Sequence, residues 1–109
     1  VYRVMAIDLK PNWFHVLLAL SEGDQHGYAI MQSVLEHTGG KVRLWPATLY
    51  GTLKKLVDAG LIEETGERPA FDDARRRYYR LTPEGQAALA AESSRLRELV
   101  RILDSRVPS

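Results

Sequence analysis

The residues best suited to chemistry lie between Trp45 and Glu64, where small side chains precede two lysines at helical spacing. Such a helix fits the major groove of DNA, where base edges are met first and phosphates flank them. An ordinary amphipathic surface helix would show a similar pattern. Helical spacing predicts an inward side of Leu49, Leu53, Leu56 and Val57 and an outward side of Ala47, Thr48, Gly51, Lys54, Lys55 and Asp58.

A run of three arginines, Arg75, Arg76 and Arg77, precedes Tyr78 and Tyr79 and forms the second candidate cluster. On a solvated hairpin edge this run would have no specific partner. On a hairpin that directly follows a DNA-reading helix, arginines reach the DNA backbone or the minor groove. We favour the second interpretation because Lys54 and Lys55 are predicted to lie on the same side of the domain.

Residue patterns typical of catalysis, metal binding or a cofactor are missing from the sequence. The histidines His15, His26 and His37 lie eleven residues apart, and the spacing of a zinc site does not occur. The sequence has no Gly-x-Ser-x-Gly turn, and Gly39-Gly40-Lys41 is only a fragment of a phosphate-binding loop. We therefore predict a protein that is not an enzyme and binds no metal or cofactor.

Composition sets the broad class of the protein. The 109 residues contain 45% hydrophobic and 27% charged residues, which suits one ordinary globular domain. Residues 41–80 carry nine Lys/Arg against six Asp/Glu, so the middle of the chain holds the positive excess although the whole chain is only +1. The chain lacks cysteine and any long apolar run, so we expect a cytoplasmic protein that does not cross a membrane.

Three helices and a hairpin are expected to position the two clusters. Helical periodicity predicts helices over residues 11–21, 27–37 and 46–59, joined through a turn at 22–24 and a connector at 41–44 that could form a brief strand. Pro46 suits the first helical position, and Gly60 suits a left-handed C-terminal cap. Strands at 61–64 and 76–81 enclose a polar loop at 65–74. This order is typical of a winged helix-turn-helix.

The last helix is predicted over residues 83–105, with Thr82 as its N-cap. Leu89, Leu96, Leu99 and Leu103 follow heptad spacing, and Val100 widens the apolar face. A helix of this length spans about 34 Å, which is longer than a domain this small can cover. A two-fold dimer contact explains the uncovered apolar length better than a helix that folds back on its own domain.

The expected fold is therefore mainly α with a small β-wing. Residues 1–82, which include an N-terminal arm, would form the winged helix-turn-helix domain. Residues 83–109 would form a C-terminal dimerisation helix that uses Leu89, Leu96, Leu99, Val100 and Leu103.

Several short motifs, in this order along the chain, resemble those of the PadR family of transcriptional regulators. They are His26-Gly27-Tyr28-Ala29-Ile30, Pro46-Ala47-Thr48-Leu49-Tyr50, residues 56–63, and the segment Arg76-Arg77-Tyr78-Tyr79-Arg80-Leu81-Thr82-Pro83-Glu84-Gly85. The resemblance covers residues 11–109, and the single C-terminal helix is similar to that of the small members of the family. It implies a homodimeric repressor that binds a palindromic operator in double-stranded DNA and is released by a small, often aromatic, molecule.

By position, the resemblance places Thr48, Tyr50 and Lys54 on the DNA-reading helix and Arg76 and Arg77 on the wing. The full set of predicted DNA contacts is Pro46, Ala47, Thr48, Tyr50, Gly51, Lys54, Lys55, Arg75, Arg76 and Arg77. The alternative is a winged-helix module that binds protein rather than DNA, because a fold does not fix a function.

Two features depart from the family pattern. Trp45 stands where a small N-cap residue would suit the reading helix, and we expect its ring to pack because tryptophan cannot accept a capping hydrogen bond. The last helix contains no aromatic residue, so we expect an effector to bind between the first helix and the last helix of the partner subunit, with Trp13 and Phe14 as stacking surface and Leu96 and Val100 as an apolar wall. Trp13 also has the spacing of a plain core residue.

Overall fold

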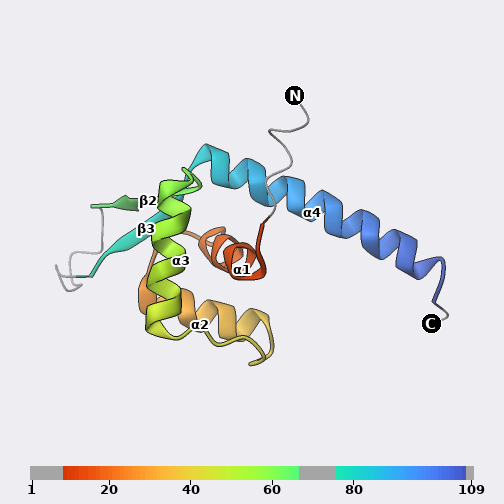
Figure 1. Cartoon of the computed structure of the whole chain (residues 1–109), viewed down its shortest axis with the longest axis horizontal. Coiled ribbons are helices and arrows are strands. Elements are labelled where there is room, and N and C mark those ends of the chain that lie inside the picture. Colours follow the sequence, from red (N-terminus) through yellow and green to blue (C-terminus); the bar gives the residue numbers. More distant parts are fainter. Residues whose placement is uncertain (1–8, 67–75, 108–109) are drawn as a thin grey trace.

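Four helices and three short strands form the part of the chain that the computed structural model describes, residues 9–66 and 76–107 (Figure 1). The helices are α1 (Pro11–Leu20), α2 (Gly27–His37), α3 (Pro46–Asp58) and α4 (Pro83–Asp104). The strands are β1 (Gln25–His26), β2 (Ile62–Thr65) and β3 (Tyr78–Leu81). The chain is thus mainly helical with a small antiparallel sheet, as predicted, and the four helices begin and end within one residue of their predicted bounds.

The core lies between α1, α2, α3 and the sheet. Its fully buried side chains are aliphatic and come from all of these elements: Val16, Leu17, Ile30, Val34, Leu49, Leu53, Leu56, Leu61 and Ile62. Helical spacing places each helical contribution on one inward face. The three helices and the hairpin therefore share one core and hold α3 at a fixed angle to the hairpin.

The sheet has the order β1–β3–β2, and both pairings are antiparallel. Gln25 pairs with Tyr79 and His26 with Tyr78, so β1 joins the wing hairpin directly to the start of α2. We did not predict β1. A strand of two residues is too short to show alternation, and its pairing partner lies more than fifty residues away.

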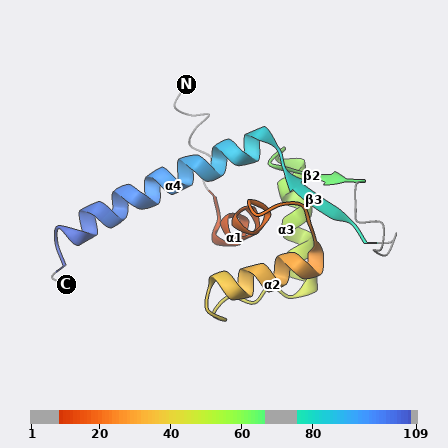
Figure 2. The same ribbon diagram turned by 180° about the vertical axis from the view of Figure 1, so that it is seen from behind.

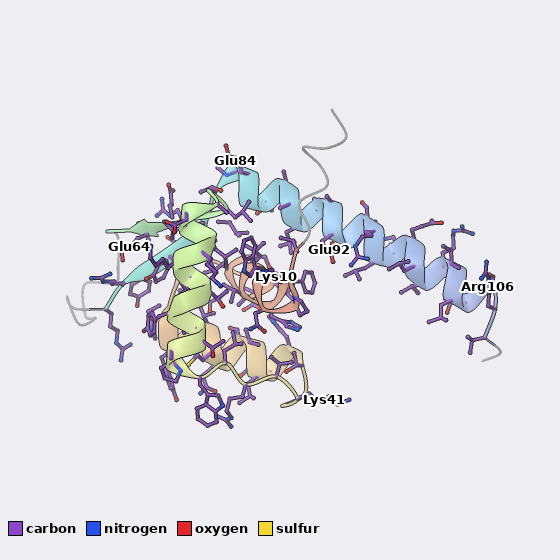
Figure 3. All side chains as sticks on the ribbon, in the orientation of Figure 1. Lys10, Lys41, Glu64, Glu84, Glu92 and Arg106 are labelled. Atoms are coloured by element: carbon purple, nitrogen blue, oxygen red, sulfur yellow. The ribbon has the colours of Figure 1, made fainter. Side chains whose placement is uncertain are left out.

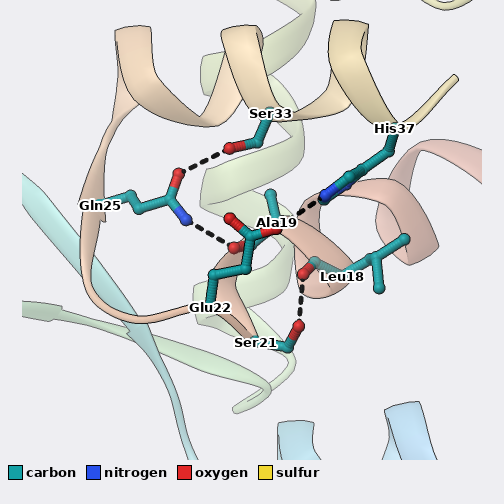
Figure 4. A network of polar contacts seen from close by, with 7 residues as sticks. All are labelled: Leu18, Ala19, Ser21, Glu22, Gln25, Ser33 and His37. Carbon is teal, nitrogen blue, oxygen red and sulfur yellow. Dashed lines mark hydrogen bonds and ion pairs between the residues drawn. The ribbon is translucent and has the colours of Figure 1, made fainter. Parts of the chain in front are cut away.

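A polar network fixes the turn between α1 and α2 (Figure 4). The Gln25 amide donates to the Ala19 carbonyl at 2.6 Å and accepts from the Ser33 hydroxyl at 3.1 Å. His37 Nε2 lies 2.8 Å from a carboxylate oxygen of Glu22, which ties the end of α2 to the same turn. These contacts hold the N-terminus of α2 beside the sheet.

A tight corner joins α3 and β2 to the start of α4. Gly60 adopts the predicted left-handed conformation, with φ at 78°. The Thr82 hydroxyl donates to the Gly60 carbonyl at 2.6 Å and accepts from the Gly85 N–H at 3.0 Å, so Thr82 is the predicted N-cap of α4. The Thr82 N–H also donates to the Leu61 carbonyl at 3.1 Å. One threonine therefore links the end of one helix to the beginning of the next.

The far part of α4 extends away from the domain, as the view from behind shows (Figure 2). Ala88 and Leu89 are partly buried against the core, whereas Leu96, Leu99, Val100 and Leu103 are exposed. The part of the chain described here measures 51 Å along its longest axis and 23 Å along its shortest. The apolar seam that we predicted from heptad spacing is thus uncovered in the single chain.

Three local expectations were wrong. Val57 was predicted to face inward, but it is 39% exposed, and Thr52 takes the inward place on α3 instead. Residues 41–44 form no strand. The Trp45 ring does not pack into the domain: it is 64% exposed and contacts the Arg43 guanidinium at 5.3 Å from the ring centroid.

Candidate nucleic-acid interface

The outward face of α3 is built from small and cationic residues. Burial of Leu49, Thr52, Leu53 and Leu56 turns the opposite side of the helix to solvent. All seven candidate DNA contacts on this helix, Pro46, Ala47, Thr48, Tyr50, Gly51, Lys54 and Lys55, are exposed. The first turn of α3 contains no acidic residue. The face therefore presents small side chains near its N-terminus and positive charge further along.

Lys54 and Lys55 differ in their surroundings. Lys54 Nζ lies 3.3 Å from a carboxylate oxygen of Asp58, one turn further along α3, and both side chains are well exposed. Exposed pairs of this kind contribute little free energy, so Lys54 can exchange this partner for a phosphate. Lys55 lies on the other flank of the helix, where it faces the first turn of α1.

A hollow of about 450 Å³ separates α3 from the wing. Arg76 Nη1 lies 3.0 Å from His26 Nε2, while His26 Nδ1 accepts the Ala29 N–H at 3.3 Å and thereby caps α2. Gly27 allows the Tyr50 side chain of α3 to lie close to the start of α2, because a Cβ at Gly27 would lie 2.5 Å from the Tyr50 hydroxyl. The hollow is lined by His26, Gly27, Tyr28, Tyr50, Arg76, Arg77 and Tyr79.

The charges of the wing are balanced partly by two acids, Glu64 of β2 and Asp24 of the turn before β1. Arg77 Nε lies 3.6 Å from Glu64, and Arg80 Nη2 lies 2.9 Å from Asp24. Burial, followed by the nearby Glu64 carboxylate, raises the pKa of the Tyr79 phenol, which therefore stays neutral and can donate a hydrogen bond. Arg75, the third arginine of the predicted run, lies outside the described residues.

A second hollow, of about 480 Å³, borders the opposite side of α3. It lies between α3 and the first turn of α1, and Trp13 is one of its lining residues. Its lining mixes apolar, polar and cationic residues: Lys10, Pro11, Asn12, Trp13, Ala47, Thr48, Gly51, Thr52 and Lys55. The face of α3 thus has one hollow on each flank, and positively charged side chains contribute to both.

A third hollow, of about 360 Å³, lies between α1 and α4 and has a mostly apolar lining. It brings together Phe14 and Leu96, two of the four predicted effector contacts, with Leu18, Gln86, Leu89, Ala90 and Ser93. The other two are elsewhere in the single chain. Trp13 packs against the core and lines the hollow beside α3, and Val100 is exposed further along α4.

Sequence reasoning overlooked several residues that the fold brings to this face. His26 was considered only as a possible metal ligand and, with Tyr28, as part of a motif, and their place beside Tyr50 follows from the pairing of β1 with β3. Lys10 and Asn12 were assigned to a lead-in and a helix start, and their approach to α3 follows from the packing of α1. Contacts between distant segments of this kind leave no local signal.

Other kinds of site were sought in the described residues. Across residues 9–66 and 76–107, His, Asp and Glu side chains nowhere gather in groups of three that could hold a metal ion. Within the same ranges, no helix has the length and apolar character needed to span a membrane.

The fold and the arrangement of α3 and the hairpin recur in proteins of known class. The Bacillus subtilis PadR protein, solved in complex with operator DNA, superposes with a TM-score of 0.66 at 24% identity, over 79% of this chain and 48% of that chain. At that identity the likeness establishes the winged-helix fold alone.

Similarity in sequence extends further. The transcriptional regulator Rv3488 of Mycobacterium tuberculosis is 37% identical over 87 residues, which cover 80% of this chain and 77% of the relative. An uncharacterized 37.1 kDa protein in transposon TN4556 of Streptomyces fradiae is 38% identical over 94 residues, but these span only 25% of its length. The family model of the transcriptional regulator PadR-like family matches residues 16–91. The chain is therefore a member of the PadR-like family, a family of transcriptional regulators and not of enzymes.

Proposed function

We propose that this protein is a homodimeric repressor that binds a palindromic operator in double-stranded DNA through α3 and the wing. The observation that carries the proposal is the exposed face of α3, where Thr48 and Gly51 precede Lys54 and Lys55 while the opposite side is buried. Small residues let the backbone approach base edges, and lysines beyond them meet phosphates. Arg76 and Arg77 would place the wing on the adjoining backbone.

The dimer is supported by the uncovered part of α4. Leu96, Leu99, Val100 and Leu103 are between 36% and 57% exposed, and they lie on one side of a helix of 22 residues. A second copy of the same seam, related by two-fold symmetry, would cover them. We therefore divide the chain into a DNA-binding unit at residues 1–82 and a dimerisation helix at 83–109. Leu89 of that helix packs against the core of the DNA-binding unit.

Release by a small aromatic molecule is supported by the apolar hollow between α1 and α4. Phe14 offers a ring to stack on, and Leu96 offers an apolar wall. Trp13 and Val100 would join this site only across the dimer, where a partner helix approaches. A ligand releases DNA only if it prefers the arrangement of subunits that misplaces the two reading helices. A regulator of this kind would act in the cytoplasm, where the DNA is.

Binding to the promoter of the gene itself tests the proposal. We expect the protein to shift a duplex of that promoter at a lower concentration than a random duplex of equal length, and the shift to weaken steeply with salt. Thr48→Ala should reduce the preference for the promoter, and Lys55→Ala should weaken binding to both duplexes alike. Equal affinity for the two duplexes at every salt concentration would favour the alternative, a module that binds protein.

A further inference from the structure

The connector before α3 has an inward and an outward side although it is not a strand. Leu44 is 4% exposed, and Val42 is partly buried against the core. The Val42 N–H donates to the Thr38 hydroxyl at 3.0 Å, which anchors the connector to the end of α2. Side chains alternate in an extended segment, so Lys41, Arg43 and Trp45 all face solvent.

The exposed ring of Trp45 has no structural task within the described chain. It does not cap α3 and does not enter the core, and its one aromatic or cationic contact there is with the Arg43 guanidinium. An indole that is 64% exposed leaves a large apolar surface in water, which is unfavourable without a partner. The cation–π contact orders both side chains and presents the guanidinium and the ring together.

Arg43 and Trp45 lie just before the N-terminal end of α3, which carries the small residues of its exposed face. Trp45 precedes Pro46, and its extended backbone, with ψ at 156°, is the conformation that a following proline enforces. The direction of the Trp45 Cα–Cβ bond relative to Ala47 and Thr48 is therefore set by the chain. Residues 38–57 contain Lys41, Arg43, Lys54 and Lys55 and no acidic residue, so the positive charge of α3 continues along the connector.

We propose that Lys41, Arg43 and Trp45, here called the connector strip, form an additional DNA contact that contributes to sequence preference at the edge of each half-site. Trp45 packs against the C5-methyl group of a thymine in the major groove, as apolar side chains do. Arg43, held over the ring, and Lys41 meet phosphates of the backbone beside it. The inference rests on the proposed function and adds a residue that specifies sequence outside α3 and the wing.

DNA fits this strip better than a protein surface does. The strip is basic, the segment from residue 38 to residue 57 contains no acidic residue, and the strip directly precedes the face of α3 that we assign to the major groove. An apolar ring flanked by two cations is the composition expected where a groove wall meets its phosphates.

The test uses duplexes selected by the full-length protein from a random library. Each thymine of the selected consensus is then replaced in turn by deoxyuridine, which lacks the C5-methyl group. For the wild type we expect a loss of about fourfold per half-site at one flanking position, the effect of one apolar carbon removed from contact. Trp45→Ala should bind more weakly and should not respond to deoxyuridine at that position.

A second arm measures the phosphate contacts. Arg43→Ala should lower the slope of log affinity against log salt by about one for each bound subunit. Arg106→Ala is the matched control, since Arg106 is also exposed but lies just beyond the C-terminal end of α4 (Figure 3). In a Trp13→Phe background Trp45 is the sole tryptophan, and its quenching by iodide should fall when the selected duplex is added.

The outcomes separate the two proposals. If the wild type selects no sequence, both the proposed function and the connector strip are refuted. If it selects a consensus but Trp45→Ala keeps the same response to deoxyuridine, only the connector strip is refuted. Unchanged iodide quenching of Trp45 in the complex, or equal salt slopes for Arg43→Ala and wild type, would also overturn it. Unchanged melting temperatures of the variants would show that the exposed side chains do not act through folding.

Discussion

Glycine-to-alanine substitution should have opposite effects on stability at two helical positions, Gly85 and Gly51. Gly85 is buried in the first turn of α4. A Cβ there would overlap the Leu61 carbonyl oxygen and lie 2.9 Å from the Leu61 carbonyl carbon. That carbonyl cannot move aside easily because it already accepts the Thr82 N–H. Gly51 lies on the exposed face of α3, and a Cβ there would meet nothing within 4 Å.

The magnitudes follow from these two environments. Overpacking against a backbone group costs about 3 kcal/mol at the upper end of the usual range. Alanine recovers about 1 kcal/mol of helix propensity, so Gly85→Ala should lower the free energy of unfolding by roughly 2 kcal/mol. Gly51→Ala should raise it by up to about 1 kcal/mol. For a domain of this size, each kcal/mol shifts the melting temperature by about 4–8 °C.

Thermal and urea unfolding, followed by circular dichroism at one fixed protein concentration, measure both effects. A fixed concentration is needed because the proposed dimerisation would contribute to apparent stability. Gly51→Ala should also weaken DNA binding while it stabilises the fold, because the added methyl group stands where the helix approaches the bases. If Gly85→Ala were as stable as the wild type, the close contact between α4 and Leu61 would be refuted. If Gly51→Ala were destabilised, the exposure of that face would be refuted.

Three further changes have definite expected results. Asp58→Asn should strengthen DNA binding by up to about fivefold in electrophoretic shift at low salt, because it releases Lys54 from an exposed ion pair; weaker binding would show that Asp58 positions Lys54 for DNA. Leu99→Asp should leave the helical circular dichroism signal of the domain intact, since Leu99 is already 46% exposed, but should yield monomers in sedimentation because a charge enters the seam; a variant that stays dimeric would refute that seam. Burial, followed by the charge of His37, lowers the pKa of His15, whose buried Nδ1 has no hydrogen-bond partner among the described residues. His15 therefore contributes stability that is complete above its unfolded pKa of about 6.5 and is lost as the pH falls toward the lowered folded value. The melting temperature of His15→Leu should fall less between pH 7 and pH 5 than that of the wild type, and parallel curves would refute this.

The helices could be predicted because their signals are local. Pro11, Pro46 and Pro83 stand at helix starts, and Gly60 ends α3 in the left-handed conformation. A proline lacks an N–H that would be unpaired there, and a glycine has no Cβ to resist a positive φ. These constraints act within a few residues, so they can be read from sequence alone.

What could not be predicted depends on distant segments. Tyr78 and Tyr79 are adjacent in β3, so their side chains point to opposite sides of the sheet, yet both are buried. β1 and the His26 ring, which meets Tyr78 edge-on at 5.3 Å between centroids, cover the side that would otherwise be open. For Trp45 the opposite happened: its ring was expected to pack against the domain, but it is exposed, while the neighbouring Leu44 and Leu49 are buried in the core.

The candidate site likewise has parts that could be predicted from the sequence and parts that could not. The outward residues of α3 followed from helical periodicity, and the heptad spacing of α4 identified the side chains that the domain leaves uncovered. The two hollows that flank α3 did not follow, because they form only where β1 and α1 approach that helix.

The corner at Thr82 has a mechanical consequence for regulation. The Thr82 hydroxyl donates one hydrogen bond and accepts another, the Thr82 N–H donates a third, and Gly85 lies close to Leu61, so α4 is joined rigidly to the end of α3. In a dimer joined at the far end of α4, this helix of 22 residues acts as a lever about 33 Å long at ~1.5 Å per residue. A tilt of roughly 10° would then displace each reading helix by about 6 Å, which exceeds one base-pair step of about 3.4 Å. If the proposed dimer and effector exist, a small change in the angle between the two α4 helices would be enough to move both α3 helices out of register with an operator.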